Sequence, residues 1–343
     1  MNKELSHLPV SVLDLATIVE GETATDAFHR SLALAQATER LGYLRYWFAE
    51  HHNMESVASS ATAVLVGYVA SGTSYIRVGS GGVMLPNHAP LIIAEQFGTL
   101  ASIYPYRIDL GLGRAPGTDP VTSHALRRTL KSDIDDFPND VVELLRYLGP
   151  KDTAARVRAI PGEGTQVPVW LLGSSTYSAQ LAAMLGLPFA FASHFAPTHL
   201  HDALQIYRQQ FKPSVYGQEP YSMACVNVIA ADTNEEAAFL ATSFYQMALG
   251  MIRNIRRPLP APVPSMENLW TEQEKAAIQH MTQYAFIGDG DCVKGELQNF
   301  IDTTQVDEIM VTSHVYDLPA RVRSYEIIAP YFKTIVNPFE NVV

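Results

Sequence analysis

The chain is poor in cysteine, with only Cys225 and Cys292 among its 343 residues. Two cysteines in no metal-ligand spacing exclude a disulfide framework and favour a reducing, cytoplasmic compartment. A run of about 18 apolar residues, as a membrane-spanning helix needs, does not occur. The first residues, MNKELSHLPV, lack the basic segment and apolar run of a secretory signal peptide. We therefore expect a cytoplasmic protein without a membrane span.

Basic residues are also scarce: 24 Lys and Arg stand against 35 Asp and Glu, a formal net charge of −11. Such a surface repels phosphate backbones and anionic lipids, so we expect neither a nucleic-acid nor a membrane partner. An anionic small molecule would need a local basic pocket. Apolar residues are plentiful, at 47% hydrophobic against 17% charged, which is enough for a large core and excludes a disordered chain.

Eight candidate strands alternate with longer helical patterns along the chain. The strands are expected at 10–15, 43–48, 76–80, 107–112, 168–172, 188–192, 223–230 and 307–312. Eight strands separated by helices indicate an α/β fold of the (β/α)₈ TIM-barrel type. The alternative, a doubly wound open sheet, normally carries a glycine-rich turn after its first strand, and residues 16–21 (ATIVEG) contain none. We therefore predict the barrel.

The helical patterns are interrupted by two insertions. Helices are expected at 24–41, 58–72, 89–103, 121–148, 176–186, 198–210, 233–252, 289–302 and 318–334. Residues 149–167 are rich in Gly, Pro and charge, and residues 253–275 combine several prolines with an Arg cluster, so both are predicted to be long loops. Loops of this length are often lids, and 253–275 is a candidate lid. With no internal repeat, we expect a single domain over 1–343.

A parallel barrel places its functional site at the carboxyl ends of its strands. Polar and glycine-rich segments follow five of the predicted strands, at 49–53 (AEHHN), 79–88 (GSGGVMLPNH), 111–117 (GLGRAPG), 173–178 (GSSTYS) and 193–195 (SHF). The alternative is that these loops are polar only because loops lie on the surface.

Adjacent histidines follow the second strand. Glu50, His51 and His52 invite a metal site, but neighbouring side chains point in different directions and no companion ligands stand at a suitable spacing. We therefore expect no metal. His51 is interpreted as a proton donor or hydrogen-bond partner, and a loop histidine bonded to backbone remains the alternative.

A phosphate site is predicted after the fourth and fifth strands. Arg114 supplies a fixed cation, and Ser174, Ser175 and Ser178 stand where a helix begins and its free N–H groups favour an anion. N-capping by Ser174 or Ser175 is the alternative. The GxG at 111–113 lacks the third glycine of a dinucleotide fingerprint, so NAD(P)H binding is not expected.

Four segments together resemble the bacterial luciferase-like flavin monooxygenases, and most of all the single-chain, group 1 luciferase-like oxidoreductases. They are YWFAEHHN, RVGSGGVMLPNHAPLIIAEQFGTL, YRIDLGLGRAPG and VPVWLLGSSTYSAQLAAMLGLPFAFASHF. The resemblance runs from about residue 8 to about residue 330. It implies a (β/α)₈ barrel, reduced FMN (FMNH₂) as cosubstrate, O₂ as oxidant and an unidentified small organic substrate. Since no dinucleotide motif is present, a separate flavin reductase is expected to supply the reduced flavin.

The resemblance also implies roles for individual residues. It makes His51 the catalytic histidine, and Trp270 loosely matches a tryptophan near a mobile loop. It assigns flavin contacts to Gly81 and Gly82 through a non-prolyl cis peptide, to Arg114, Ser175 and Ser178 at the phosphate, and to Ser174 through its backbone.

Two departures from luciferase itself narrow the expectation. Gly113 stands where the luciferase catalytic subunit has its reactive cysteine, so light emission is not expected. The chain also stands alone where luciferase pairs two subunits, and we expect a homodimer. Relatives that use deazaflavin F420 supply an alternative function, an F420-dependent oxidoreductase. A non-catalytic flavin-binding protein is a third reading, against which His51 and Arg114 argue.

Overall fold

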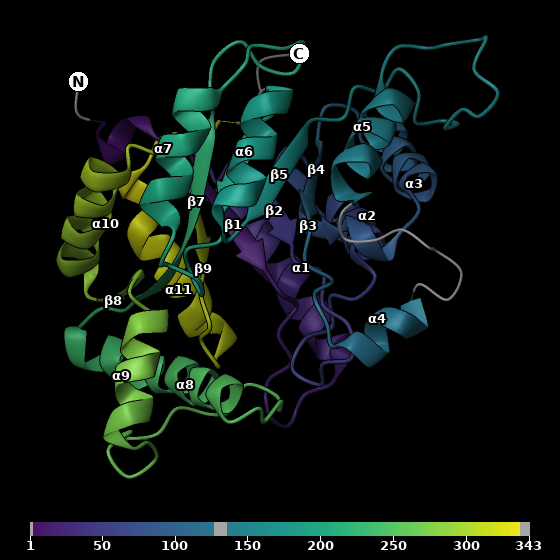
Figure 1. The fold of residues 1–343 in the computed structure, drawn as a ribbon. Coiled ribbons are helices and arrows are strands. Elements are labelled where there is room, and N and C mark those ends of the chain that lie inside the picture. The colour runs from purple at the N-terminus through teal and green to yellow at the C-terminus, as the bar shows by residue number, and fades with distance from the viewer. Residues whose placement is uncertain (1–2, 127–135, 337–343) are drawn as a thin grey trace.

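The computed structural model describes residues 3–126 and 136–336, in which parallel strands form a closed barrel (Figure 1). The strands are β1 (Val10–Asp14), β2 (Arg45–Phe48), β3 (Arg77–Met84), β4 (Ile108–Gly113), β5 (Val169–Gly173), β6 (Phe189–Phe191), β7 (Ser222–Ala230), β8 (Ala285–Gly288) and β9 (Glu308–Thr312). From β1 to β7, each strand pairs with the next one along the chain. The ring is closed by β9, which pairs with β7 on one side and with β1 on the other. The predicted eight-stranded (β/α)₈ barrel is confirmed.

One strand was not predicted. β8 pairs with Asn227–Ala230 of β7, whereas β9 pairs with Met223–Asn227, so the long β7 serves both partners in turn. β8 has only four residues, which alternate between half-buried and buried, and so short a segment gives little periodicity to read. It extends the sheet beyond the ring without changing the fold.

Helices cover the outside of the barrel (Figure 1). They are α1 (Ala24–Arg40), α2 (Thr62–Ser71), α3 (Pro90–Ile103), α4 (Pro120–Leu126), α5 (Phe137–Leu148), α6 (Thr176–Leu185), α7 (Leu200–Gln210), α8 (Asn234–Ile252), α9 (Glu272–Met281), α10 (Gly290–Thr304) and α11 (Leu318–Ile328). Their starts follow local chemistry: Thr23 and Asp26 form a capping box at α1, and Thr233 caps α8.

Two predicted segments differ from the structure, and a third is tested only in part. The helix expected at 121–148 includes α4 and α5, and its residues 127–135 lie outside the described residues. The insertion 253–275 is not all loop, because a capping box of Thr271 and Glu274 starts α9 within it. The last helix ends at Ile328 and is followed by a short 3₁₀ turn. The insertion 149–167 contains no helix or strand, as predicted.

The amino end of the barrel is closed by buried charges. Arg45 lies 2.7 Å from Asp109 and 3.1 Å from Glu308, and Arg77 also pairs with Asp109. Burial alone would raise the pKa of Asp109, but the charges of Arg45 and Arg77 lower it below its usual value. The two arginines thus pair with the buried carboxylates of Asp109 and Glu308.

The middle of the barrel is filled by apolar side chains that come from strands around the ring. Trp47 and Trp170 pack edge to face, with ring centres 5.3 Å apart, beside Leu13, Met223 and Met310. With the amino end and the middle closed, the carboxyl ends of the strands are left for a ligand. In the described part of the chain, no helix is both long and apolar enough to cross a membrane.

Candidate active site

A cavity of about 450 Å³ opens at the carboxyl end of the barrel. Figure 1 shows this end at the bottom, where α4, α8 and α9 project. The cavity is lined by His51, Asn53, Met54, Glu55, Val57, Ser60 and Arg256. Arg256 comes from the insertion 253–275. Leu259 of the same insertion bonds to the loop after β1, because its N–H donates to the Ile18 carbonyl and its carbonyl accepts from the Glu20 N–H. The predicted lid segment is therefore an anchored wall of the cavity.

His51 follows β2 and is half-buried in this wall. Its Nδ1 lies 3.4 Å from the carbonyl oxygen of Gly117. Because a carbonyl only accepts, Nδ1 carries the proton and Nε2 remains an acceptor. Burial lowers the pKa of His51 below its usual value, so the imidazole is neutral near pH 7.

Gly117 brings its loop close to this histidine. It has a φ of +64°, and a Cβ built on it would lie 2.9 Å from the carbonyl oxygen of Glu50. Glycine alone meets both conditions without strain. The loop after β4 is thus held against the loop that carries His51.

Glu50 joins the loop after β2 to the end of β3 by hydrogen bonds. Its side chain is buried, and its Oε1 accepts from His52 Nε2 at 2.8 Å and from His88 Nε2 at 2.9 Å. Its Oε2 accepts from the Met84 N–H at 3.1 Å. Burial alone would raise the pKa of Glu50, but the hydrogen bonds from His52 and His88 lower it to about 2.

His52 makes a structural hydrogen bond to Glu50, and the part played by His88 was not predicted from the sequence. His88 belongs to the segment 79–88 after β3, whose position at a strand end was the available signal. The ligand atoms of Glu50, His52 and His88 all lie within 4.8 Å of one another, a spacing that a metal site would also need. The distances between them are those of hydrogen bonds, so the cluster holds the loops after β2 and β3 together.

The residues predicted to hold a phosphate come together at the start of α6. Arg114 follows β4, and its guanidinium carbon lies 4.0 Å from the centre of the Tyr177 ring in the first turn of α6. Ser174 and Ser175 precede this helix, and the Ser175 hydroxyl makes no capping hydrogen bond. Within residues 3–126 and 136–336, the Arg114 guanidinium has no carboxylate partner. A cation and two serines therefore lie at the N-terminus of one helix.

Ser178 lies deeper than the other two serines. It is 3% exposed, and a Cβ built on Gly173 would lie 2.6 Å from its Oγ. Its hydroxyl thus packs on the end of β5.

The Gly81–Gly82 peptide of β3 is cis, as predicted. A Cβ on Gly82 would lie 2.7 Å from the Gly111 carbonyl oxygen, and one on Gly81 would lie 2.9 Å from a methyl group of Leu13. The backbone here packs too closely on its neighbours for a side chain.

Several polar residues at the same end of the barrel were missed as site residues. They are His194 after β6, Asn227 of β7, Thr312 of β9 and His314 after it. Burial is the main cause that lowers the pKa of His194 to about 3 and that of His314 to about 4, so both imidazoles are neutral near pH 7. A Ser-His pair follows both β6 and β9, and this repetition was the available signal.

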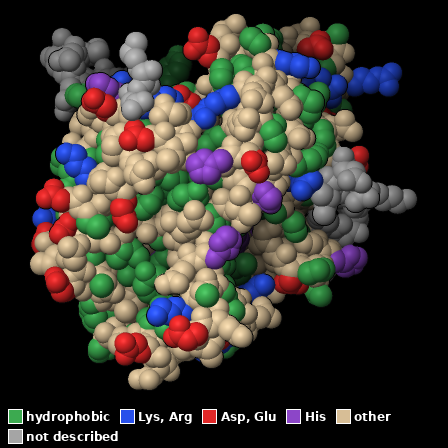
Figure 2. Space-filling view, turned by 60° about the vertical axis from the view of Figure 1, so that its left-hand side comes forward, with side chains coloured by type: hydrophobic (Ala, Val, Ile, Leu, Met, Phe, Trp, Pro, Cys, Tyr) green, Lys and Arg blue, Asp and Glu red, His purple; other side chains and the backbone are tan. Residues whose placement is uncertain are grey.

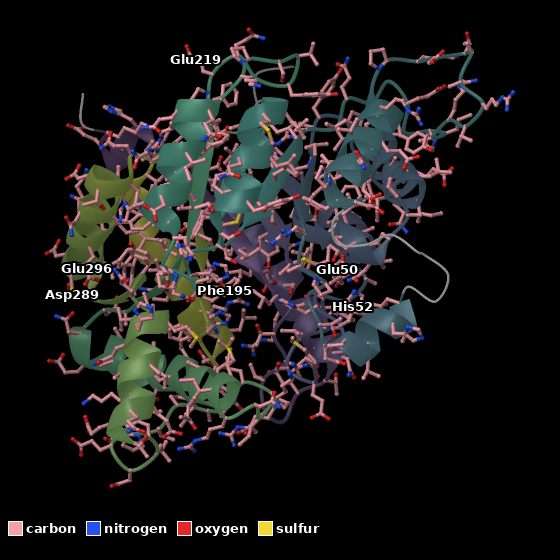
Figure 3. All side chains as sticks on the ribbon, viewed as in Figure 1. Glu50, His52, Phe195, Glu219, Asp289 and Glu296 are labelled. Atoms are coloured by element: carbon pink, nitrogen blue, oxygen red, sulfur yellow. The ribbon has the colours of Figure 1, made fainter. Side chains whose placement is uncertain are left out.

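The space-filling view shows histidine side chains gathered near the middle of one face (Figure 2). Phe195 lies at the same end of the barrel as Glu50 and His52 (Figure 3). It is 47% exposed, and its ring packs edge to face on His194, with centres 4.8 Å apart. Trp270, which loosely matched a tryptophan near a mobile loop, packs on Tyr245 with ring centres 5.7 Å apart. Both belong to a small apolar cluster formed by α8, α9 and the insertion 253–275.

Comparison with known proteins gives consistent matches. The family model for luciferase-like monooxygenases matches residues 8–304. The uncharacterized protein YvbT of Bacillus subtilis (strain 168) is 53% identical over 333 residues, which cover 97% of this chain and 99% of that protein. A luciferase-like monooxygenase of Escherichia coli (strain K12) is 53% identical over 317 residues, 92% of this chain and 95% of that protein.

A solved structure agrees with these sequence matches. The crystal structure of apo-MsnO8 is 35% identical and has a TM-score of 0.89, with 95% of this chain and 98% of that chain covered. The two sequence relatives and this structure each match more than nine tenths of the chain, and the family model matches the barrel up to residue 304. The chain belongs to the luciferase-like monooxygenase family.

Proposed function

We propose that the protein is a flavin-dependent monooxygenase that uses reduced FMN and O₂ to insert one oxygen atom into a small organic substrate. The observation that carries this proposal is the group at the start of α6: Arg114 has no carboxylate partner in the described part of the chain, and the Ser175 hydroxyl is not used for capping. In a chain of net charge −11, a cation without an acidic partner beside a helix N-terminus suits a phosphate.

The residues fit FMN as follows. Arg114, Ser174, Ser175 and the first N–H groups of α6 would hold the phosphate, with Ser178 at the base of the site. The Gly81–Gly82 peptide would support the ring. Bound reduced flavin supplies two electrons, so that O₂ gives one oxygen atom to the substrate and the other to water.

His51 would act at the cavity through Nε2. Its neutral state and the contact of Nδ1 with Gly117 favour an imidazole that accepts a proton or a hydrogen bond from the substrate. Of the two roles expected from the sequence, this favours the hydrogen-bond partner over the proton donor. The walls formed by residues 51–60 and by Arg256 would limit the access of water to the reacting atoms.

Because no dinucleotide fingerprint occurs in the sequence, a separate reductase would deliver reduced flavin in the cytoplasm. We propose a homodimer as the assembly.

A titration tests the cofactor. The protein is titrated with FMN, riboflavin and F420, with binding followed by flavin fluorescence, and FMN is expected to bind about tenfold or more tightly than riboflavin. Oxygen uptake with FMNH₂ and a cell extract, with metabolites followed by mass spectrometry, then identifies the consumed substrate. Equal affinity for FMN and riboflavin would place the phosphate elsewhere, and a preference for F420 would replace the oxygenase proposal.

A further inference from the structure

The interior face of the barrel ends in polar side chains. Met223 and Cys225 of β7 and Met310 of β9 belong to the apolar cluster inside the ring. Side chains alternate along a strand, so Asn227 and Thr312, each two residues further on, face the interior at its carboxyl end. These two residues are neighbours in the β7–β9 register, and both are buried, at 2% and 0% exposure.

Three polar atoms of this layer have no hydrogen-bond partner among residues 3–126 and 136–336. The Asn227 Nδ2 donates to the carbonyl oxygen of His194 at 2.6 Å, which fixes the amide so that Oδ1 points away from that carbonyl. In the described parts of the chain, Asn227 Oδ1, Thr312 Oγ1 and His194 Nδ1 have no hydrogen-bond partner. A buried polar atom without a partner is unfavourable, and these three come from the ends of three strands, β6, β7 and β9, at the carboxyl end of the barrel. They leave hydrogen bonds that a polar ligand group could make.

This layer belongs to the same end of the barrel as His51. The imidazole of His194 is close enough to His314 and His51 for their charges to lower its pKa further. Each histidine packs against an aromatic ring. Phe195 packs on His194, and Phe244 stacks on His314 with ring centres 5.5 Å apart.

The surroundings favour an uncharged ligand group. The charges that act on His314 are Arg321 and Asp14, and these pair with each other at 3.0 Å. Among the described residues, the histidines of this layer do not form a group with metal-ligand spacing. Burying an ionised head here without a counter-charge would be costly.

We propose that Asn227 and Thr312 recognise the polar head of the organic substrate, and that this head is an uncharged amide. Its N–H donates to Asn227 Oδ1, and its carbonyl oxygen accepts from the Thr312 hydroxyl. An ester of the same shape lacks the N–H and leaves Oδ1 unpaired. This assignment rests on the proposed function, since it concerns the substrate of that site.

Two probes of equal length test the assignment: N-hexylacetamide and hexyl acetate. Their binding to the protein, with and without oxidised FMN, is measured by ligand-observed NMR. We expect the amide to bind about tenfold more tightly than the ester, because the site leaves an acceptor unpaired with the ester. Thr312→Val and Asn227→Leu are each expected to reduce this preference to about twofold or less.

Thr312→Val is the sharper variant, because its hydroxyl bonds to no described residue and its removal is expected to leave the chemical denaturation midpoint unchanged or raised. Thr304→Val is the matched control: this threonine is 1% exposed, bonds to the Phe300 carbonyl and precedes β9 at the opposite end of the barrel. The control is expected to keep the amide preference.

Equal binding of amide and ester, no binding of the amide, or an amide preference that survives both variants would overturn the assignment. The readout does not depend on oxygenation. An amide preference in a protein that binds no FMN would therefore refute the proposed function and leave the subsite standing.

Discussion

The hydrogen-bonded carboxylate of Glu50 makes a prediction about acid stability. Its pKa of about 2, against an ordinary 4.5, is held low by the hydrogen bonds from His52 and His88. At about 1.4 kcal/mol per pH unit, this interval corresponds to about 3 kcal/mol. Because the folded-state pKa is the lower one, the contribution is fully present above pH 4.5 and is lost as the pH falls toward 2.

Glu50→Gln removes the charge and places an amide group where Oε2 accepts from the Met84 N–H. The variant is expected to lower the free energy of unfolding by about 3 kcal/mol at neutral pH and by only about 1–1.5 kcal/mol near pH 3. Urea denaturation of both proteins across this range measures the difference. Glu267→Gln, an exposed carboxylate on the insertion, is the control and is expected to change little at any pH. A Glu50→Gln effect of the same size at pH 7 and pH 3 would show that its ionisation does not stabilise the fold.

Three further predictions concern the site. Arg114→Ala is expected to narrow the preference for FMN over riboflavin by about tenfold, measured by fluorescence titration, whereas Arg257→Ala should leave it unchanged. His51→Ala is expected to lower substrate-coupled turnover by about 10²-fold while flavin affinity is kept, with more of the consumed oxygen appearing as hydrogen peroxide; equal peroxide yields in His51→Ala and wild type would remove this histidine from the reaction. Gly117→Ala combines a positive φ with a contact on the Glu50 carbonyl, so it is expected to destabilise the fold by about 1–3 kcal/mol in urea denaturation, and an unchanged midpoint would show that the loop shifts freely.

The positions of the predicted site residues follow from local sequence. Alternating strand and helix signals can be read within windows of a few residues, and a parallel barrel then places every strand end on one face. His51, Arg114 and Ser175 were therefore found from the residues, and the family resemblance added the cis peptide at Gly81–Gly82.

Tertiary structure decided which of these strand ends meet and which polar atoms lack partners. His88 bonds to Glu50 from another strand end, and Asn227 lies beside Thr312 through the β7–β9 register; neither contact leaves a local pattern in the sequence. The insertion likewise became a wall of the cavity through the backbone bonds of Leu259, which composition does not encode. Sequence periodicity specifies the face on which a side chain lies, but hydrogen-bond partners depend on distances between strands that only the closed barrel sets.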